Sequence, residues 1–340
     1  MNPSEVLEIA KRYVEAADAV CTSEQSTSVR DSLFAITLVD GRRVMMKFYD
    51  SAERFDCEVA ALRTINETTT PHSPRLLLSD RRHLITFLEK LHGRNWTAVL
   101  TYEPLTVQCH LAEQIGKELR SLHSVSLGQT RVPRAALDHL IRLECNDLPK
   151  TSRRISTSVL VSDSDRTHCY DLLQTLHSNL RHSVGRIDAS GDNESALLEK
   201  AMLHGDLWAG NIFVSSTDES TTTVLLDYEY AMIGERIIDL ARIFSRGFVA
   251  RDASDDYQLM PNEQLWTSFA KGYGLRKKNI ADSVYFRRAV YFSLVRTVNY
   301  YGLLLEREQN SDRVDRYLQA LKKISLATLR SLNSHTLSHQ

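Results

Sequence analysis

The sequence has few cysteines, and they do not cluster. The 340 residues contain five of them, at Cys21, Cys57, Cys109, Cys145 and Cys169. The number is odd, and no two lie at the close spacing of a zinc site or of a disulfide framework. The set therefore favours a reducing, cytoplasmic compartment.

Long apolar runs and an excess of one charge are also missing. No segment has the roughly 20 apolar residues of a spanning helix, or the uncharged apolar core of a secretory signal. The net charge of −1 gives no reason to expect nucleic acid or a membrane surface as a partner. With 42% hydrophobic residues, the chain is expected to be a globular monomer or homodimer, long enough for two lobes.

The strongest polar pattern lies in the second half of the chain. His204, Asp206 and Asn211 follow one another closely, and two apolar runs on either side of the polar turn 215–223 lead on to Asp227. These runs predict a β-hairpin that brings Asp227 back beside Asn211. Phosphoryl transfer needs such a set, because one carboxylate accepts the acceptor's proton while an amide and a second carboxylate hold metal ions on the phosphates.

Two motifs carry a family resemblance. HGDLWAGN (204–211) resembles the H-x-D-x-x-x-x-N catalytic loop of the aminoglycoside phosphotransferase and choline kinase superfamily, and LLDYEY (225–230) resembles its metal-binding strand. The resemblance implies a protein-kinase-like bilobal α+β fold. The lobe 1–103 would hold an antiparallel sheet with one helix and bind nucleotide, and the mostly helical lobe 104–340 would carry catalysis and bind the acceptor.

The same resemblance implies roles for individual residues. Asp206 would be the catalytic base, and Asn211 and Asp227 would bind Mg²⁺. Asp239, in the family's D-L-A segment, would support the catalytic loop. The cofactors implied are ATP or GTP together with Mg²⁺, and the acceptor is a small-molecule hydroxyl.

A second part of the expected nucleotide site lies near the N-terminus. Two β-rich runs, 33–39 and 43–48, meet at an Asp-Gly turn and predict a hairpin. Lys47, at the end of the second run, matches the family's phosphate-binding lysine. A helix over 51–65 follows, and its Glu58 is the expected ion-pair partner of Lys47.

Other nucleotide contacts are expected on loops. The Ser-rich stretch around Ser28 would cover the phosphates through hydroxyl and backbone N–H groups. Two strands, over 83–88 and 97–103, would lead to a hinge at 102–105, where Glu103 and Leu105 would contact the adenine through the backbone.

The remaining segments predict mostly helices. Residues 1–20 have the spacing of an amphipathic helix, and further helices are expected over 107–124, 236–248, 263–273, 283–306 and 311–331. The polar stretches 149–165 and 183–194 are expected to be loops or insertions between helices, and composition alone does not decide whether they cover the acceptor site. His123 is expected to serve packing or capping.

The acceptor remains open at this point. Six aromatic residues could form a cage for a quaternary ammonium, although aromatics at helical spacing are more often core: Trp266, Tyr285, Tyr291, Phe292, Tyr300 and Tyr301. The acidic loop 251–262 could instead recognise an aminoglycoside. Ketosamine and homoserine kinases are further alternatives, as is an inactive nucleotide-binding scaffold. A protein kinase is disfavoured by the lack of H-R-D and A-P-E segments.

Overall fold

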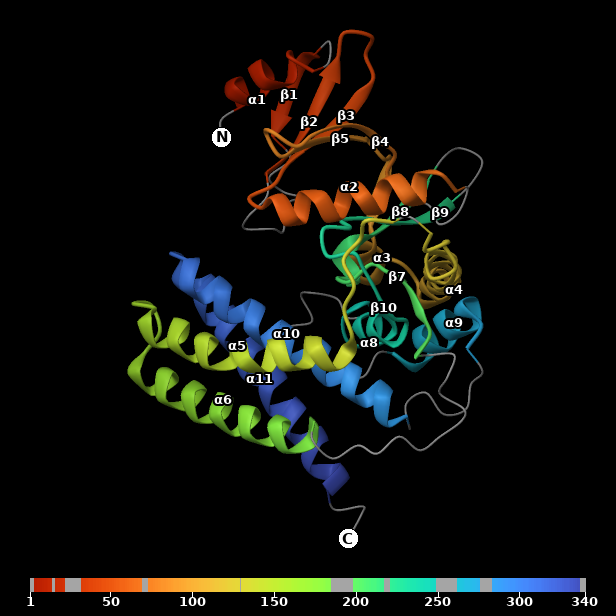
Figure 1. The fold of residues 1–340 in the computed structure, drawn as a ribbon. Helices are drawn as coiled ribbons and strands as arrows, with labels where there is room; N and C mark the ends of the chain where they lie inside the picture. Colours follow the sequence, from red (N-terminus) through yellow and green to blue (C-terminus); the bar gives the residue numbers. More distant parts are fainter. Residues whose placement is uncertain are drawn as a thin grey trace. The chain divides into compact units, whose positions relative to one another are not determined.

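The computed structural model describes residues 3–13, 16–21, 32–68, 73–128, 130–184, 198–216, 221–248, 262–275 and 283–336. Contacts divide the chain into two compact units. The first comprises 1–134, 200–233 and 262–277, and the second comprises 135–199, 234–261 and 278–340. Figure 1 shows the elements of both.

A five-stranded antiparallel sheet, in the order β1-β2-β3-β5-β4, opens the first unit (Figure 1). Its strands are β1 (Ala16–Cys21), β2 (Ser32–Leu38), β3 (Arg43–Phe48), β4 (Leu76–Asp80) and β5 (Ile85–Glu89). The predicted hairpin is confirmed, because β2 and β3 pair from Ser32–Phe48 to Thr37–Arg43. Gly41 supplies its turn with a φ of +82°, a conformation that glycine adopts without strain.

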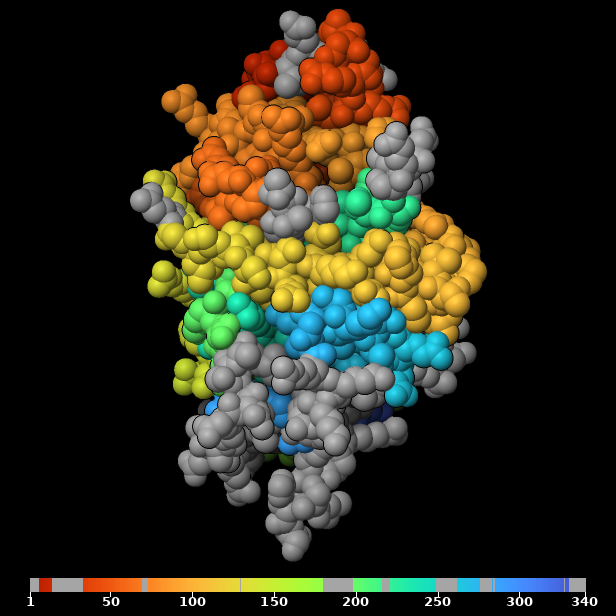
Figure 2. Space-filling model, turned by 90° about the vertical axis from the view of Figure 1, so that its right-hand side faces the viewer, coloured from red at the N-terminus to blue at the C-terminus, as the bar shows by residue number. Residues whose placement is uncertain are grey.

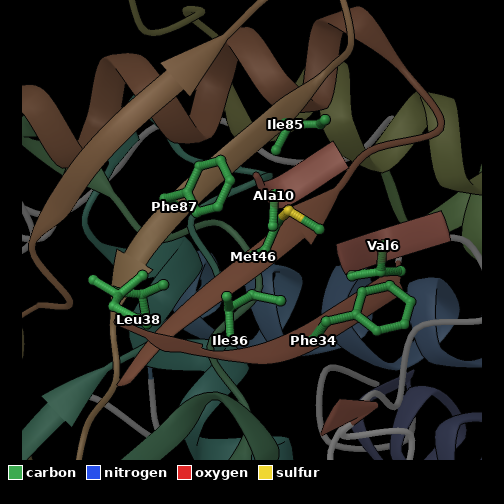
Figure 3. Close-up of a cluster of buried hydrophobic side chains, with 9 residues drawn as sticks. Val6, Ala10, Phe34, Ile36, Leu38, Met46, Ile85 and Phe87 are labelled. Carbon is green, nitrogen blue, oxygen red and sulfur yellow. The ribbon is translucent and has the colours of Figure 1, made fainter. Parts of the chain in front are cut away.

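The prediction of a helix over 1–20 is wrong beyond its first half. Helix α1 ends at Ala10, and Ala16–Cys21 forms β1 along the edge of β2. The physical reason is that Val6 and Ala10 already cover the sheet, packing into a buried cluster with Phe34, Ile36 and other side chains of the strands (Figure 3). The next residues then gain more from pairing their backbone with β2.

Helix α2 (Ala52–Asn66) follows β3 in the chain, as predicted. The predicted strand over 97–103 is wrong, because Trp96–Tyr102 forms helix α3. The side chain of Asn95 caps this helix by accepting the N–H of Thr97 at 2.6 Å, and Trp96 and Val99 are buried. The cap and the buried face outweigh the β propensity of the segment.

The rest of the first unit contains short strands and two packed helices. Strands β6 (Gly93–Asn95), β8 (Ile212–Ser216) and β9 (Thr221–Leu225) form one sheet, in which the predicted β8–β9 hairpin is confirmed. Strands β7 (Lys200–Leu203) and β10 (Met232–Glu235) form another, and the boundary between the units falls within β10, after Ile233. Helices α4 (Leu105–Leu122) and α9 (Glu263–Tyr273) pack together, and Figure 2 shows their gold and light-blue surfaces. At the end of α4, the ring of His123 is buried and bonds the Tyr273 hydroxyl at 2.7 Å, so its predicted packing role is confirmed.

The described part of the second unit is mostly helical. It contains α5 (Leu137–Thr157), α6 (Asp163–Val184), α8 (Ile237–Arg246), α10 (Val284–Arg307) and α11 (Ser311–Thr336). The expected loop over 149–165 is wrong, because α5 runs on through Pro149 to Thr157 and α6 starts at Asp163. Leu148 and Ile155 keep the buried face of α5 intact across this polar stretch. The other expected loop, 183–194, lies outside the described residues from 185 onward.

Candidate active site

The predicted catalytic loop begins where β7 ends, and His204 fixes its position. Its imidazole is fully buried and lies between two backbone groups. Nε2 is 2.7 Å from the carbonyl oxygen of Leu226, and Nδ1 accepts the N–H of Asp206 at 3.3 Å. Since a carbonyl can only accept, Nε2 carries the proton and Nδ1 is the acceptor. One buried histidine therefore ties the loop of Asp206 to the residue before Asp227.

Gly205 lets the loop approach the segment after Asp227. Its φ is +78°, and a Cβ built on it would lie 1.9 Å from the carbonyl oxygen of Tyr230. Both the backbone conformation and the space require glycine. The H-G-D form of the motif thus has a steric cause in this chain.

Asn211 joins the loop to the hairpin. It ends a single 3₁₀ turn (Ala209–Asn211), and its side-chain Nδ2 donates to the carbonyl oxygen of Asp206 at 3.0 Å. Its own carbonyl accepts the N–H of Leu226 at 2.9 Å, and Asn95 donates to the adjacent Gly210 carbonyl at 3.0 Å. The hairpin therefore brings Asp227 back beside Asn211, as the sequence predicts.

Lys47 lies among carboxylates from two other elements. Its Nζ is 2.6 Å from Glu58 Oε2 on α2 and 2.7 Å from Asp227 Oδ1, while Glu229 Oε2 is 3.6 Å away. The predicted Lys47–Glu58 ion pair is thus confirmed. Asp227 itself has a φ of +68°, a left-handed conformation that is uncommon outside glycine but more accessible to Asp.

Burial and the neighbouring charges shift the pKa of Lys47 in opposite directions. Burial alone would lower the pKa of Lys47, but the nearby charges of Asp227 and Glu58 outweigh it and hold the pKa well above its ordinary value. The lysine therefore stays protonated. Burial and Glu58 also raise the pKa of Tyr49, whose neutral hydroxyl donates to Glu58 at 2.7 Å.

A further ion pair at this site was not predicted from the sequence. The guanidinium of Arg54 bonds Glu229 Oε1 and the hydroxyl of Tyr230, the latter at 3.0 Å, and lies 4.9 Å from the centre of the Tyr230 ring. One signal was available, because Arg54 precedes Glu58 by four residues and so shares its helix face. Its partners, 175 and 176 residues further on, left no such signal.

The hinge residues lie between α3 and α4. The backbone N–H of Glu103 donates to Val99 O at 3.0 Å, and its carbonyl accepts from Gln108 Nε2 at 2.7 Å. Its carboxylate pairs with Arg94 at 2.5 Å. Leu105 begins α4, where the first N–H groups of a helix have no intrahelical acceptor. Adenine contact by these two residues stays a prediction.

Other predicted residues are not brought to the site by the described contacts. Ser28 and the acidic loop 251–261 lie outside the described residues. Asp239 is fully buried in α8, in the second unit, and its support of the catalytic loop stays a prediction. Of the six aromatics, Trp266 belongs to the first unit and stacks on Phe269, whereas the other five lie on α10 in the second.

Neither a membrane-spanning helix nor a metal-binding cluster is found among the described residues. None of the described helices combines the length and apolar character needed to cross a membrane. Among the same residues, no three or more His, Cys, Asp or Glu side chains are grouped so that they could hold a metal ion.

Several solved structures share this fold. Spectinomycin phosphotransferase, in complex with ADP and spectinomycin, is 15% identical, with 96% of this chain and 98% of that chain covered and a TM-score of 0.64. Ethanolamine kinase of Plasmodium vivax is 13% identical, with coverage of 98% and 96% and a TM-score of 0.63. Choline kinase of Cryptosporidium parvum Iowa II is 14% identical, with coverage of 98% and 97% and a TM-score of 0.63. The predicted protein-kinase-like α+β fold is therefore confirmed.

The sequence itself matches the model of the phosphotransferase enzyme family over residues 28–271. The chain belongs to this family, as the motifs at 204–211 and 225–230 predict. A search of the curated proteins found no significant match.

Proposed function

We propose that the protein transfers the γ-phosphoryl group of ATP to a hydroxyl of a small molecule, an amino alcohol or an aminoglycoside. The observation that supports this function is the set of contacts joining Lys47, Glu58 and Asp227 to the loop of Asp206 and Asn211 within one unit. Similar structures named for ethanolamine, choline and spectinomycin support the acceptor class, and the ADP complex supports the nucleotide.

Each residue has a role that follows from its surroundings. Lys47, protonated and held by Glu58, would bind the phosphates of the nucleotide. Asp206 lies on a loop fixed by a buried histidine and would accept the proton of the acceptor hydroxyl. Its backbone is anchored through His204 and Asn211, which would hold the loop in place during the reaction.

The donor set fits magnesium. Asn211 donates through Nδ2 to Asp206, which leaves its amide oxygen as a ligand, and Asp227 supplies carboxylate oxygens. Mg²⁺ commonly binds one or two protein oxygens and completes its shell with water and substrate phosphates, so two such side chains suffice. The ion would neutralise charge on the phosphates when bound.

The test is a coupled assay of ADP release across amino alcohols, aminoglycosides, ketosamines and homoserine. We expect turnover with the wild type on one of the first two classes. Asp206→Ala should retain nucleotide affinity and lose activity by at least ~100-fold, because general-base catalysis contributes at least that much. Asp163→Ala, at a carboxylate that is 96% exposed on α6, is the matched control and should be fully active.

Two results would oppose the proposal. Nucleotide binding without turnover of any acceptor would favour an inactive scaffold. Equal loss of nucleotide affinity and activity in Asp206→Ala would indicate that the residue supports the fold rather than the chemistry.

A further inference from the structure

One face of α2 carries two charged residues that reach the candidate site. Glu58 pairs with Lys47, and one helical turn earlier Arg54 pairs with Glu229. The Arg54 side chain is 11% exposed and that of Glu229 is 4% exposed. The guanidinium also bonds the Tyr230 hydroxyl and lies against its ring. Such burial and geometry distinguish this pair from an ordinary surface salt bridge.

Glu229 lies between the two cations. Its Oε1 bonds Arg54, and its Oε2 is 3.6 Å from Lys47 Nζ. The same lysine is already at 2.6 Å and 2.7 Å from Glu58 and Asp227. Glu229 is thus the most distant of the three carboxylates around Lys47. The oxygen of Glu229 that faces the lysine is Oε2, whereas Oε1 bonds Arg54.

We propose that Arg54 is a positioning residue of the nucleotide site, which holds Glu229 back from Lys47 and so keeps the lysine available to nucleotide phosphates. The inference depends on the proposed function. If the guanidinium is removed, a buried carboxylate loses a charged hydrogen bond, and Lys47 is the cation within reach. A lysine drawn closer to a third carboxylate would attract a phosphate less strongly.

The experiment measures MgADP binding by titration calorimetry without any acceptor. Arg54→Met should weaken the affinity about tenfold, the low end of what one charged hydrogen bond contributes. Arg54→Met/Glu229→Gln should restore it to the level of Glu229→Gln alone, because the competing charge is gone. Arg63→Met is the matched control, since Arg63 lies on the same helix, is exposed and donates to the hydroxyl of Ser79 at 3.0 Å rather than to a carboxylate of the site.

The outcomes are distinct. A wild type that binds no MgADP overturns the proposed function and this inference together. A wild type that binds, with Arg54→Met binding equally well, overturns the inference alone. So does a double variant that is folded but binds no better than Arg54→Met, because the charge of Glu229 is then not what weakens binding.

Folding is checked by thermal unfolding of each variant without nucleotide. If Arg54→Met is unfolded at the titration temperature, Arg54→Lys and Arg54→Lys/Glu229→Gln replace it. Lysine keeps the charge but loses the planar group that bonds Glu229 and Tyr230 together. We then expect weakened binding in the single variant and recovery in the double, and the absence of either would refute the role of Arg54.

Discussion

Replacing Gly205 by alanine tests whether the catalytic loop depends on close backbone contact. The residue has a φ of +78°, and Gly41 in the β2–β3 turn has a φ of +82°. A Cβ at Gly41 would meet nothing within 4 Å, whereas one at Gly205 would lie 1.9 Å from the Tyr230 carbonyl oxygen. The two variants share the conformational cost and differ in the clash, so Gly41→Ala is the matched control.

The expected loss of stability in each variant follows from the cost of the left-handed conformation and, at Gly205, from the added clash. A left-handed alanine costs about 1–2 kcal/mol, which both variants should show. At Gly205 the carbon lies about 1.4 Å inside an ordinary carbon–oxygen contact of about 3.3 Å. Relieving such a clash costs a further ~1–3 kcal/mol of stability. Gly205→Ala should therefore be the less stable variant by at least ~1 kcal/mol.

Urea unfolding followed by circular dichroism measures the loss of stability in the two variants. Phosphotransfer to the acceptor found by screening measures their activity. Moving the loop by about 1 Å should lower kcat/KM by ~10-fold or more in Gly205→Ala, while Gly41→Ala stays fully active. Equal unfolding midpoints and equal activities in the two variants would refute the claim that the loop is fixed by this contact.

Three further predictions concern charge and burial. Lys47→Met should destabilise the protein by about 3–5 kcal/mol, because it leaves the buried carboxylate of Glu58 without its counter-charge. Lys47→Met/Glu58→Gln should recover part of this loss in urea unfolding, and no recovery would argue against the ion pair. Hydrogen bonds, above all from Tyr13, hold the pKa of Asp80 well below its ordinary value, so its contribution to stability is present above about pH 4 and is lost as the pH falls. The stability difference between wild type and Asp80→Asn should then shrink from pH 7 to pH 3, and a constant difference would contradict the shift. Burial raises the pKa of the Cys57 thiol to about 11, so it should stay unlabelled by iodoacetamide at pH 8 in peptide mass spectrometry, and rapid labelling of the folded protein would contradict its burial.

The part of the site that could be predicted from the sequence is the part formed by neighbours in the chain. Asp206, Asn211 and Asp227 come together through a loop and one hairpin, and Lys47 lies eleven residues before Glu58. The hairpin pattern predicts the approach of Asp227 to Asn211, whereas the Lys47–Glu58 pair is expected from the family resemblance. By contrast, the partners of Arg54 lie 175 and 176 residues away, and no local pattern indicates which strand ends beside its helix.

The elements that were mispredicted failed for a similar reason. Residues 97–103 have the composition of a strand, but the side chain of Asn95 caps them as a helix. The polar segment of α5 continues as a helix because Thr151 bonds Asn299 of α10 at 2.7 Å and Ile155 is buried. Residues 16–21 form a strand because β2 lies beside them. In each case, a cap or a tertiary partner outweighed intrinsic propensity.

The balance of charge around Lys47 bears on how a nucleotide would bind. Three carboxylates, Glu58, Asp227 and Glu229, surround it, whereas only Arg54 adds a second positive charge in these contacts. A polyanionic phosphate chain is therefore opposed by the carboxylates even though the lysine attracts it. If Asp227 holds a divalent cation together with the nucleotide, as proposed, its carboxylate would act as a ligand instead of repelling the phosphates. Under the proposed function the three carboxylates would then differ in what they do: Glu58 would orient the lysine, Asp227 would bind the ion, and Glu229 would be held by Arg54 at a distance from the lysine.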